Sequence, residues 1–327
     1  MLQARLTGFG SYVPDDVLCN HDLEKIVDTT NDWIVTRTGI EERRIAKENE
    51  TSSDMAIQAG KDALNDAGID PDRVDLVVVA TATPDYLMPS TAALVQAELG
   101  AVNAAAVDFQ AACTGYLYGL SMAKAYVESG IYRTILLIAS DKMSAFIDYQ
   151  DRNTCVLFGD GASAAVIAHK GSGLAISSIC LGADGKQAEL IMIPAGGSKY
   201  PASSQTVSQG QHYFKMSGKE VFKHAVRRMS SAAQECLHQA KLREDEISWL
   251  VPHQANERII DAMAKQFHIP LSQVAKTLKK YGNTCAPSLA ITLDELQKTK
   301  TINTGEHLLL AAFGAGLTWG AAVLTKI

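Results

Sequence analysis

The 327-residue sequence lacks a long uninterrupted apolar segment of the kind that crosses a membrane. Its most apolar stretch, residues 308–327, contains Gly314, Gly316 and Gly320 and is predicted to form a strand, a glycine turn and a second strand. The first residues, MLQARLTGFGSYVP, have no apolar core and are predicted to be a strand rather than a signal peptide. We therefore expect no association with a membrane.

Cysteines are few and irregularly spaced. None of the six stands in a C-x-x-C pair, which argues against a zinc site or a disulfide scaffold; they are Cys19, Cys113, Cys155, Cys180, Cys236 and Cys285. This spacing predicts a reducing, cytoplasmic location and no bound metal. Basic residues are outnumbered, with 30 Lys and Arg against 36 Asp and Glu, and the net charge of −6 argues against general binding to nucleic acid.

The chain carries an internal repeat. Residues 63–81 (ALNDAGIDPDRVDLVVVAT) align without a gap on residues 236–254 (CLHQAKLREDEISWLVPHQ), and both have the pattern of a helix, an acidic turn and a buried strand. Two shorter pairs are TILLIASD (134–141) with HLLLAAFG (307–314), and FGDGASAAVI (158–167) with FGAGLTWGAAVL (313–324). We predict two copies of one α/β unit, residues 1–172 and residues 173–327.

The apolar strands predict the fold class. Stretches such as DLVVVAT and TILLIAS lack the alternation of a half-exposed strand, so both faces of their sheet should be covered. Helical stretches lie between them, for example residues 51–68, which Thr51 or Ser52 is placed to cap. Alternating strands and helices predict mostly parallel or mixed sheets wrapped by helices, with a cleft where the two halves meet.

One cysteine, Cys113, stands where a predicted strand (104–109) gives way to a predicted helix that Gly130 ends. The free N–H groups and the dipole of a helix N-terminus lower the pKa of a thiol from its usual value of about 8.5. Ala111, Ala112 and Gly115 leave room for a substrate. On position alone, a nucleophile and a packed thiol are both good interpretations of Cys113.

Two polar residues are candidate partners of Cys113. His253 follows the buried strand that ends at Pro252, and the repeat matches this strand with residues 75–81. Ligands of α/β proteins bind at the carboxyl ends of strands, although a single histidine is more often structural. Asn283 follows Gly282 at nearly the repeat-equivalent position of Cys113, although Gly-Asn pairs are common in turns. Matching positions in both halves favour a Cys-His-Asn site.

A basic stripe lies on the predicted helix that begins near MSGKEVFKHAVRRM. Ser217 and Glu220 have the spacing of a capping box. Three cations recur every fourth residue, namely Lys219, Lys223 and Arg227, with Lys215 and Arg228 beside them. Such runs are usually solvated faces, but on an acidic chain this one is also suited to an acidic protein or a phosphate.

Taken together, DWIVTRTGIEERR, ACTG, FGDGASAAV, VPHQANERII, GNT and FGAGLTWG resemble the β-ketoacyl-acyl carrier protein synthase III family, the initiating condensing enzymes of bacterial fatty-acid synthesis. The resemblance covers essentially the whole chain. It implies the thiolase-like five-layered α/β/α/β/α fold, which agrees with the duplication, and a homodimer.

The resemblance also implies roles for the three candidate residues. Cys113 takes the acyl group of an acyl-CoA as a thioester, while His253 and Asn283 bind the thioester carbonyl of malonyl-acyl carrier protein. Decarboxylation there gives an enolate that attacks the acyl-cysteine. The backbone N–H groups of Cys113 and Ala315 would form a second oxyanion hole. No cofactor is expected, because acyl-CoA and malonyl-acyl carrier protein are both substrates.

Other roles carry over by motif. Trp33 and Arg152 resemble the pair that sandwiches the CoA adenine, and Arg37 resembles a phosphate contact. Phe222 resembles the phenylalanine on the malonyl side, and Asn256 is a further substrate-site candidate. The segment implicated in carrier-protein docking matches Gln254, Ala255, Asn256, Glu257 and Arg258, with the basic stripe adding positive charge.

Several residues depart from the family pattern. Met88 stands where an aromatic residue often shapes the acyl pocket across the dimer interface, and methionine is flexible enough to admit another acyl chain. The remaining departures are Ala315 in GAG rather than GGG, Lys219 for asparagine, Asn153 for glycine and Cys285 for serine. These departures affect the expected identity of the acyl donor more than the expected class of reaction.

The predicted function is the decarboxylative condensation of an acyl-CoA with malonyl-acyl carrier protein, giving 3-oxoacyl-acyl carrier protein, CO2 and CoA. One alternative is a specialised condensing enzyme of secondary metabolism that uses an aryl- or longer acyl-CoA. A second is a Cys-His-Asn hydrolase, although the C-G-x-C-W signature of the papain type is missing around Cys113. A third is a non-catalytic member of a synthase complex.

Overall fold

The computed structural model describes residues 2–327. The strands are β1 Arg5–Tyr12, β2 Val17–Cys19, β3 Glu42–Arg44, β4 Leu76–Ala80, β5 Ala105–Phe109, β6 Thr134–Asp141, β7 Gly161–Ala168, β8 Leu174–Ala183, β9 Ile191–Met192, β10 Lys215–Met216, β11 Ile247–Pro252, β12 His307–Gly314 and β13 Thr318–Lys326. The helices are α1 Asn20–Leu23, α2 Asn31–Thr38, α3 Ser52–Ala67, α4 Thr91–Leu99, α5 Gly115–Ser129, α6 Ser204–Ser208, α7 Gly218–Ala240, α8 Glu257–Gln266, α9 Leu278–Tyr281 and α10 Pro287–Thr299. Within this range, none of the helices combines the length and the apolar character needed to span a bilayer.

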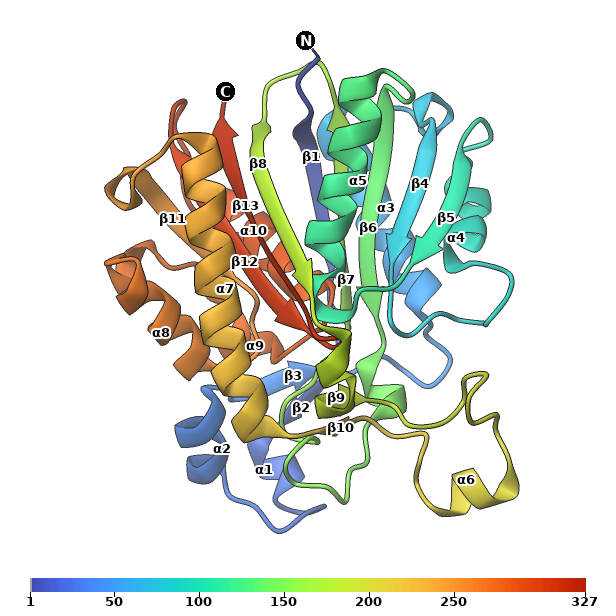
Figure 1. The fold of residues 1–327 in the computed structure, drawn as a ribbon. Coiled ribbons are helices and arrows are strands. Elements are labelled where there is room, and N and C mark those ends of the chain that lie inside the picture. The colour runs from blue at the N-terminus through green and yellow to red at the C-terminus, as the bar shows by residue number, and fades with distance from the viewer. Residues whose placement is uncertain (1) are drawn as a thin grey trace.

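Within residues 2–327, nine strands form one mixed sheet in the order β11-β12-β13-β8-β1-β7-β6-β4-β5. The sheets of the two halves join where β1 meets β8, through the pairs Arg5 with Ala175 and Leu6 with Leu174. The strands fan out from this junction, with β11 at one edge and β5 at the other (Figure 1). The short strand pairs β2–β3 and β9–β10 lie apart from this sheet.

The repeated segments have the same secondary structure. In the first half α3 leads through a 3-10 turn (Pro71–Arg73) into β4, and in the second α7 leads through another (Glu244–Glu246) into β11. β4 is parallel to β6, which is antiparallel to β7; likewise β11 is parallel to β12, which is antiparallel to β13. The predicted boundary between residues 172 and 173 falls between β7 and β8 and stays a prediction.

The helices form three layers around the two parts of the sheet. α3 packs on the outer face of β1, β7 and β6, and α7 packs on the outer face of β8, β12 and β13. α5 and α10 touch one another and contact strands of both halves, so they form the middle layer. Figure 1 shows α5 alongside β6 and α7 alongside β12 and β13. The predicted fold class, α/β with this five-layered arrangement, is confirmed.

Coverage on both faces explains the strand sequences. Every residue of β4 is buried, and so is every residue of β7, which is why these strands show no alternation of apolar and polar residues. Three apolar cores result: one under α3 and α4, one around the middle layer, and one under α7 and α8.

The predicted helix ends were partly right. Thr51 caps α3 by accepting a hydrogen bond from the Asp54 N–H, and α5 ends at Gly130 in the left-handed conformation (φ 78°). The capping box predicted for Ser217 and Glu220 is wrong, because the Ser217 side chain makes no cap hydrogen bond. Glu220 instead accepts from Lys223 Nζ at 2.8 Å, one turn further along the exposed face.

Candidate active site

The nucleophile candidate lies at the start of α5. Cys113 is the middle residue of a 3-10 turn (Ala112–Thr114) that runs directly into this helix. Ala112 has a left-handed backbone (φ 45°), an uncommon conformation for a residue with a side chain, and it turns the chain from β5 into the helix. The first N–H groups of a helix have no partner within it, so they and the helix dipole favour a thiolate at this position.

Two glycines allow other elements to approach Cys113. A Cβ atom on Gly314, at the end of β12, would lie 2.9 Å from the Cys113 backbone nitrogen and 3.1 Å from its Cβ. A Cβ atom on Gly115 would lie 3.1 Å from that of Ala80 and 3.2 Å from that of Ala286. Both glycines are therefore required by close packing, and the end of β12 lies directly against the Cys113 backbone.

The turn that holds Ala315 is tied to the Cys113 turn by hydroxyl groups. Thr114 Oγ1 donates to Thr318 Oγ1 at 2.8 Å, and Thr318 Oγ1 donates to the Ala315 carbonyl at 2.9 Å. Ala315 follows Gly314, whose backbone touches Cys113, so its N–H belongs to the immediate surroundings of the thiol. This placement fits the oxyanion role predicted for Ala315, which stays a prediction.

His253 follows the last residue of β11, and it is buried. Its N–H donates to the Ala311 carbonyl at 2.8 Å, which continues the pairing of β11 with β12. Its Nδ1 atom forms a short hydrogen bond with the Ser288 hydroxyl, and Ser288 Oγ also accepts from the Gln254 N–H at 3.4 Å. The Ser288 hydroxyl can donate to Nδ1 or accept from it, and a donor role for Nε2 requires that the hydroxyl donates.

Asn283 is also buried, and its backbone is fixed by Leu157 and Gly159. Its N–H donates to the Leu157 carbonyl at 2.8 Å, and its own carbonyl accepts from the Gly159 N–H at 3.1 Å. The side-chain oxygen accepts from the Cys285 N–H at 2.9 Å. The two protons of the side-chain Nδ2 are therefore left to serve a substrate oxygen.

His253 lies next to Cys113, and Asn283 is connected to Cys113 through Cys285. The Cys113 Sγ atom lies 3.7 Å from the Sγ atom of Cys285, and the hydrogen bond from Cys285 lowers the pKa of Cys113 well below its ordinary value. The positive charge of a protonated His253 and a hydrogen bond from its ring act in the same direction, against the effect of burial. A low pKa of this kind is characteristic of reactive cysteines.

Two residues of this site were missed from the sequence. Ser288 orients His253 from the first turn of α10, and Asp141 lies at the end of β6 with its carboxylate buried. Burial raises the pKa of Asp141 to about 6. The signal for Asp141 was present, because a carboxylate that ends a buried and mostly apolar strand needs a local reason to be there. Ser288 carried no such signal.

Trp33 lies between two arginines. The Arg152 guanidinium is 4.5 Å from the centre of the Trp33 ring, and that of Arg37 is 5.4 Å from it. Arg152 is held by the Asp28 carbonyl, to which it donates at 2.9 Å. Trp33 and Arg37 lie on α2, so the structure brings together the three residues predicted to bind CoA.

The predicted docking segment begins at β11 and enters α8. Gln254 was expected to meet a carrier protein, but this is wrong, because the side chain is completely buried. It accepts from the N–H groups of Thr277 and Leu278 and donates to the Pro252 carbonyl, so it anchors the loop after β11. A polar residue in a polar turn gave no indication of these distant partners.

The rest of that segment is accessible. Asn256 caps α8 and donates to the Arg37 carbonyl at 3.0 Å, while the exposed Arg258 donates to the Thr36 carbonyl at 3.3 Å. Glu257 pairs with Lys276, and Ala255 is partly exposed. The start of α8 therefore rests against α2, the helix that carries Trp33.

The predicted basic stripe is exposed on α7, which packs against α8. Lys219, Lys223 and Arg227 are all exposed, and Phe222 is 38% exposed among them. Arg228 is different, because it pairs with Asp184 at 3.0 Å and lies 4.3 Å from the centre of the Trp319 ring. Met88 lies away from this face of the fold, in the segment before α4. Its own chain covers little of this residue, which is 84% exposed.

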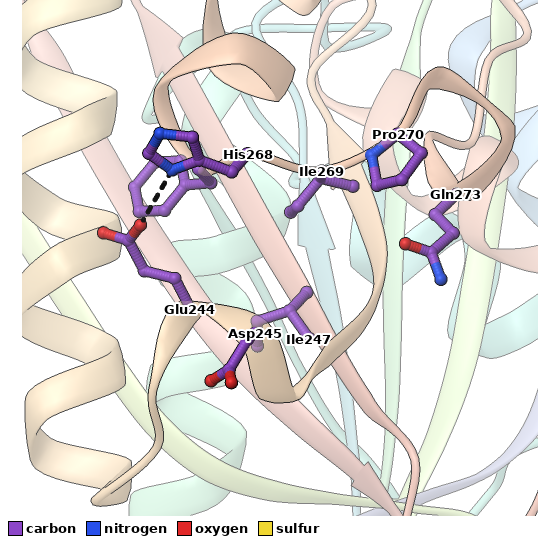
Figure 2. Close-up of a pocket in the computed structure, with 8 residues that line it drawn as sticks. Glu244, Asp245, Ile247, His268, Ile269, Pro270 and Gln273 are labelled. Carbon is purple, nitrogen blue, oxygen red and sulfur yellow. Dashed lines mark ion pairs between the residues drawn. The ribbon is translucent and has the colours of Figure 1, made fainter.

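One surface hollow lies away from Cys113, at the opposite end of β11. Its volume is about 510 Å³, and it is lined by Glu244, Asp245, Ile247, Phe267, His268, Ile269, Pro270 and Gln273 (Figure 2). It sits at the first residue of β11, whereas His253 follows the last, and Figure 2 shows Glu244 paired with His268 across it. A six-residue strand separates the hollow from the site, a length of roughly 20 Å.

Among residues 2–327, no group of three or more His, Cys, Asp or Glu side chains is placed to hold a metal ion. The groups described around Cys113 are a thiol with a lowered pKa and N–H donors. Such a set is suited to acyl transfer and to the stabilisation of a negative oxygen.

Comparison with known proteins agrees with this site. Residues 107–185 match the sequence model of 3-oxoacyl-[acyl-carrier-protein] synthase III, and residues 237–326 match that of its C-terminal part. The chain is 58% identical over 327 residues to the β-ketoacyl-[acyl-carrier-protein] synthase III of Chlamydia trachomatis serovar D, with 100% of both chains covered. It is 50% identical to that of Caldanaerobacter subterraneus, with 99% of this chain and 98% of the relative covered.

Among solved structures, 3-oxoacyl-[acyl-carrier-protein] synthase III from Aquifex aeolicus superposes with a TM-score of 0.91 at 44% identity, covering 99% of this chain and 100% of that one. Fold and site together define an acyltransferase of the condensing type with the thiolase-like fold. More narrowly, the chain belongs to the β-ketoacyl-[acyl-carrier-protein] synthase III family. These relatives favour neither a hydrolase nor a non-catalytic partner.

Proposed function

We propose that this chain joins an acyl-CoA to malonyl-acyl carrier protein at Cys113, as the initiating condensation of fatty-acid synthesis. The observation that supports the proposal is that His253 and Cys285 lie against the Cys113 thiol while Asn283 is hydrogen-bonded to Cys285. In the first step the Cys113 thiolate attacks the acyl carbonyl, a new carbon–sulfur bond forms, and the CoA thiolate leaves. No cofactor is needed, because the thioester already activates the acyl group.

The second step is the decarboxylation of the malonyl group. The bond to its carboxylate breaks, CO2 leaves, and the electron pair moves onto the thioester oxygen. Donors on His253 Nε2 and Asn283 Nδ2 stabilise that oxygen, and such donors typically contribute about 10²–10³ in rate each. The enolate carbon then attacks the acyl-Cys113 carbonyl, a carbon–carbon bond forms, and the Cys113 sulfur leaves with its electron pair.

The acyl-CoA approaches past α2. Trp33 offers a flat apolar face and Arg152 a planar cation, which suits the adenine ring, while Arg37 on the same helix suits a phosphate. Asn256 connects this surface to α8 through its hydrogen bond to the Arg37 carbonyl. Phe222 on α7 supplies an apolar contact next to the basic stripe.

The carrier protein docks on the basic face formed by Arg258 on α8 and by Lys219, Lys223 and Arg227 on α7. These cations are exposed and lie on two helices that contact one another, on a chain whose net charge is −6. A local excess of positive charge attracts an acidic partner. Ala255, Asn256 and Glu257 form the partly exposed side of the same surface, and Gln254 does not belong to it.

The chain assembles as a homodimer through β5. This strand is the edge of the sheet, and its Val107 is 46% exposed. Nearby segments expose Val102, Leu87 and Met88 to 74%, 89% and 84%. An exposed apolar edge strand pairs readily with another strand. Here the expected partner strand is β5 of a second copy of the chain. Val107→Lys is expected to give monomers in sedimentation analysis.

The test is acyl loading. Purified protein is incubated in turn with acetyl-, branched, medium-chain, long-chain and aryl-CoA, and the Cys113 peptide is weighed by mass spectrometry. An adduct of the acyl mass on Cys113, followed by 3-oxoacyl product when malonyl-acyl carrier protein is added, is the expected result. The absence of an adduct with every acyl-CoA would refute the covalent step.

The same panel tests the specialised alternative. Met88 is flexible and exposed, and Ala315 narrows the GAG turn, so the preferred acyl chain is set by residues that depart from the family pattern. Preference for an aryl- or long-chain acyl-CoA over short chains would favour secondary metabolism. Free thiols at all six cysteines within residues 2–327 fit the proposed cytoplasmic location.

A further inference from the structure

Cys285 has no role in the function proposed above, yet its thiol is in contact with that of Cys113. The two Sγ atoms are 3.7 Å apart. Cys285 is buried in the segment before α10, where its backbone is left-handed (φ 63°). Its N–H donates to the Asn283 side-chain oxygen at 2.9 Å, so this residue touches two of the three candidate catalytic groups.

The surroundings of Cys285 decide which of the two thiols carries the proton. The hydrogen bond with Cys113, burial and the negative charge of Asp141 all raise the pKa of Cys285 well above its ordinary value. Asp141 is itself fixed, because its carboxylate accepts from the N–H groups of Ala82 at 2.7 Å and Ala286 at 3.0 Å. Cys285 therefore keeps its proton, and Cys113 is the group that ionises. The Asp141 carboxylate is a second acceptor for the Cys285 S–H, and it competes with the Cys113 thiolate for this one proton.

The titratable groups around the two thiols come from three elements. His253 approaches from the end of β11, Asp141 from the end of β6 and Cys285 from the start of α10. The turn after β12 contributes Gly314 and Ala315, which do not titrate.

We infer that Cys285 is a positioning residue, which donates its S–H proton to the Cys113 thiolate and its N–H proton to the Asn283 oxygen. One side chain thereby supports the nucleophile while the same residue's backbone aims the Asn283 amide at the substrate. The inference rests on the proposed role of Cys113. A residue that only filled space at this position would affect the stability of the fold but not the ionisation of Cys113.

The test measures the ionisation of Cys113 directly. The rate of alkylation of Cys113 by iodoacetamide is followed by mass spectrometry over a pH series, without acyl-CoA or carrier protein. Cys285→Ala removes the S–H donor and keeps the N–H. Because a hydrogen bond to a charged group contributes about one pKa unit or more, we expect the profile to shift upward by about one pH unit. Well below the midpoint of the native protein, this shift makes alkylation about tenfold slower.

Three further variants complete the test. Cys285→Gly also lacks the donor, suits the left-handed backbone and replaces the alanine variant if that one fails to fold. Cys285→Ser restores a donor and is expected to return the profile to that of the native protein. Cys155→Ala, which removes another buried free thiol, is the matched control and should leave the profile unchanged.

Superimposable profiles for the native protein and both donor-free variants would overturn the inference. A serine variant shifted as far as alanine would overturn it too. The outcome is separable from the proposed function: a missing acyl adduct on Cys113 with the expected alkylation shifts would reject the proposed reaction and leave the role of Cys285 standing.

Discussion

The Ser288 hydroxyl meets the Nδ1 atom of His253 in the buried centre of the molecule, 35 residues away along the chain. The contact joins the first turn of α10 to the end of β11. In the proposed mechanism Ser288 donates to Nδ1, so the ring proton lies on Nε2 and the imidazole faces the substrate as a donor.

Ser288→Ala should therefore slow decarboxylation more than acyl loading. Losing one hydrogen bond of about 1 kcal/mol weakens the Nε2 donor and is expected to slow the release of CO2 from malonyl-acyl carrier protein roughly fivefold to tenfold. Loading of Cys113 by acyl-CoA should stay within about twofold, since the oxyanion formed in that step is expected at the Cys113 and Ala315 N–H groups. Equal losses in both steps would contradict the proposed role of the contact.

Asn283→Ala removes a donor from the malonyl thioester oxygen. Decarboxylation should fall by about 10²–10³, the usual consequence of losing one such donor, while the acyl adduct on Cys113 still forms. Release of CO2 is measured with carboxyl-labelled malonyl-acyl carrier protein, and Asn303→Ala, on the exposed loop before β12, is the control. Unchanged decarboxylation together with lost thioester hydrolysis would instead support a Cys-His-Asn hydrolase.

Trp33→Ala should weaken the binding of CoA. Stacking of a base on an aromatic ring contributes about 1–3 kcal/mol, so we expect the dissociation constant measured by calorimetry to rise at least fivefold. A truncated acyl-pantetheine, which has no adenine, is the matched control and should bind both proteins equally. If CoA bound Trp33→Ala as it binds the native protein, the assignment of this face to the adenine would be wrong.

Reversal of charge on the basic face should weaken carrier-protein binding alone. Lys223→Glu combined with Arg227→Glu is expected to raise the Michaelis constant for malonyl-acyl carrier protein by about tenfold at low salt, and the effect should shrink as salt screens the charges. Loading from acyl-CoA should not change. Lys61→Glu, on the exposed face of α3 in the opposite outer layer, is the control, and an equal effect there would indicate general repulsion.

Asp141 predicts a pH dependence of stability. Burial raises its pKa from 3.8 to about 6, so the folded protein binds this proton more tightly than the unfolded chain does. The contribution of Asp141 to stability is therefore present below pH 4 and lost as the pH rises through about 6. A shift of this size corresponds to about 3 kcal/mol.

The matching experiment is denaturant unfolding of the native protein and of Asp141→Asn, whose side chain does not titrate. Between pH 4 and pH 7 the free energy of unfolding of the native protein should fall by about 3 kcal/mol relative to that of the variant. A constant difference across this range would show that Asp141 does not keep its proton in the folded state.

Much of the fold was predictable because the information was local. The apolar runs that became β4, β6, β11 and β12 needed no partner to be recognised, and the repeat then fixed how they recur. His253 and Asn283 were found because each directly follows a predictable element or turn. Position within the repeat, and not residue type, singled them out.

What could not be predicted depends on partners far along the chain. Gln254 lies in a sequence typical of a surface turn. Its amide oxygen nevertheless accepts from the N–H groups of Thr277 and Leu278, and these bonds hold the side chain in the interior. Ser288 and Asp141 meet His253 and Ala286 only because the middle layer is shared by both halves. The unused cap at Ser217 has a local origin instead, because Glu220 pairs with Lys223 three residues further along its own helix.

The close packing of α5 against the start of α10 affects the spacing of the residues in the whole site. Cys113 precedes α5, and Asn283 and Ser288 flank the start of α10, so the distance between these helices sets the width of the catalytic chamber. Gly115 has no side chain and Ala286 has only a methyl group, and a Cβ atom on Gly115 would lie 3.2 Å from that of Ala286, so the contact is tight. The starts of these two helices, one from each half, therefore set the width of the chamber. A larger residue at this contact would push the helices apart and displace the nucleophile and the donors at the same time.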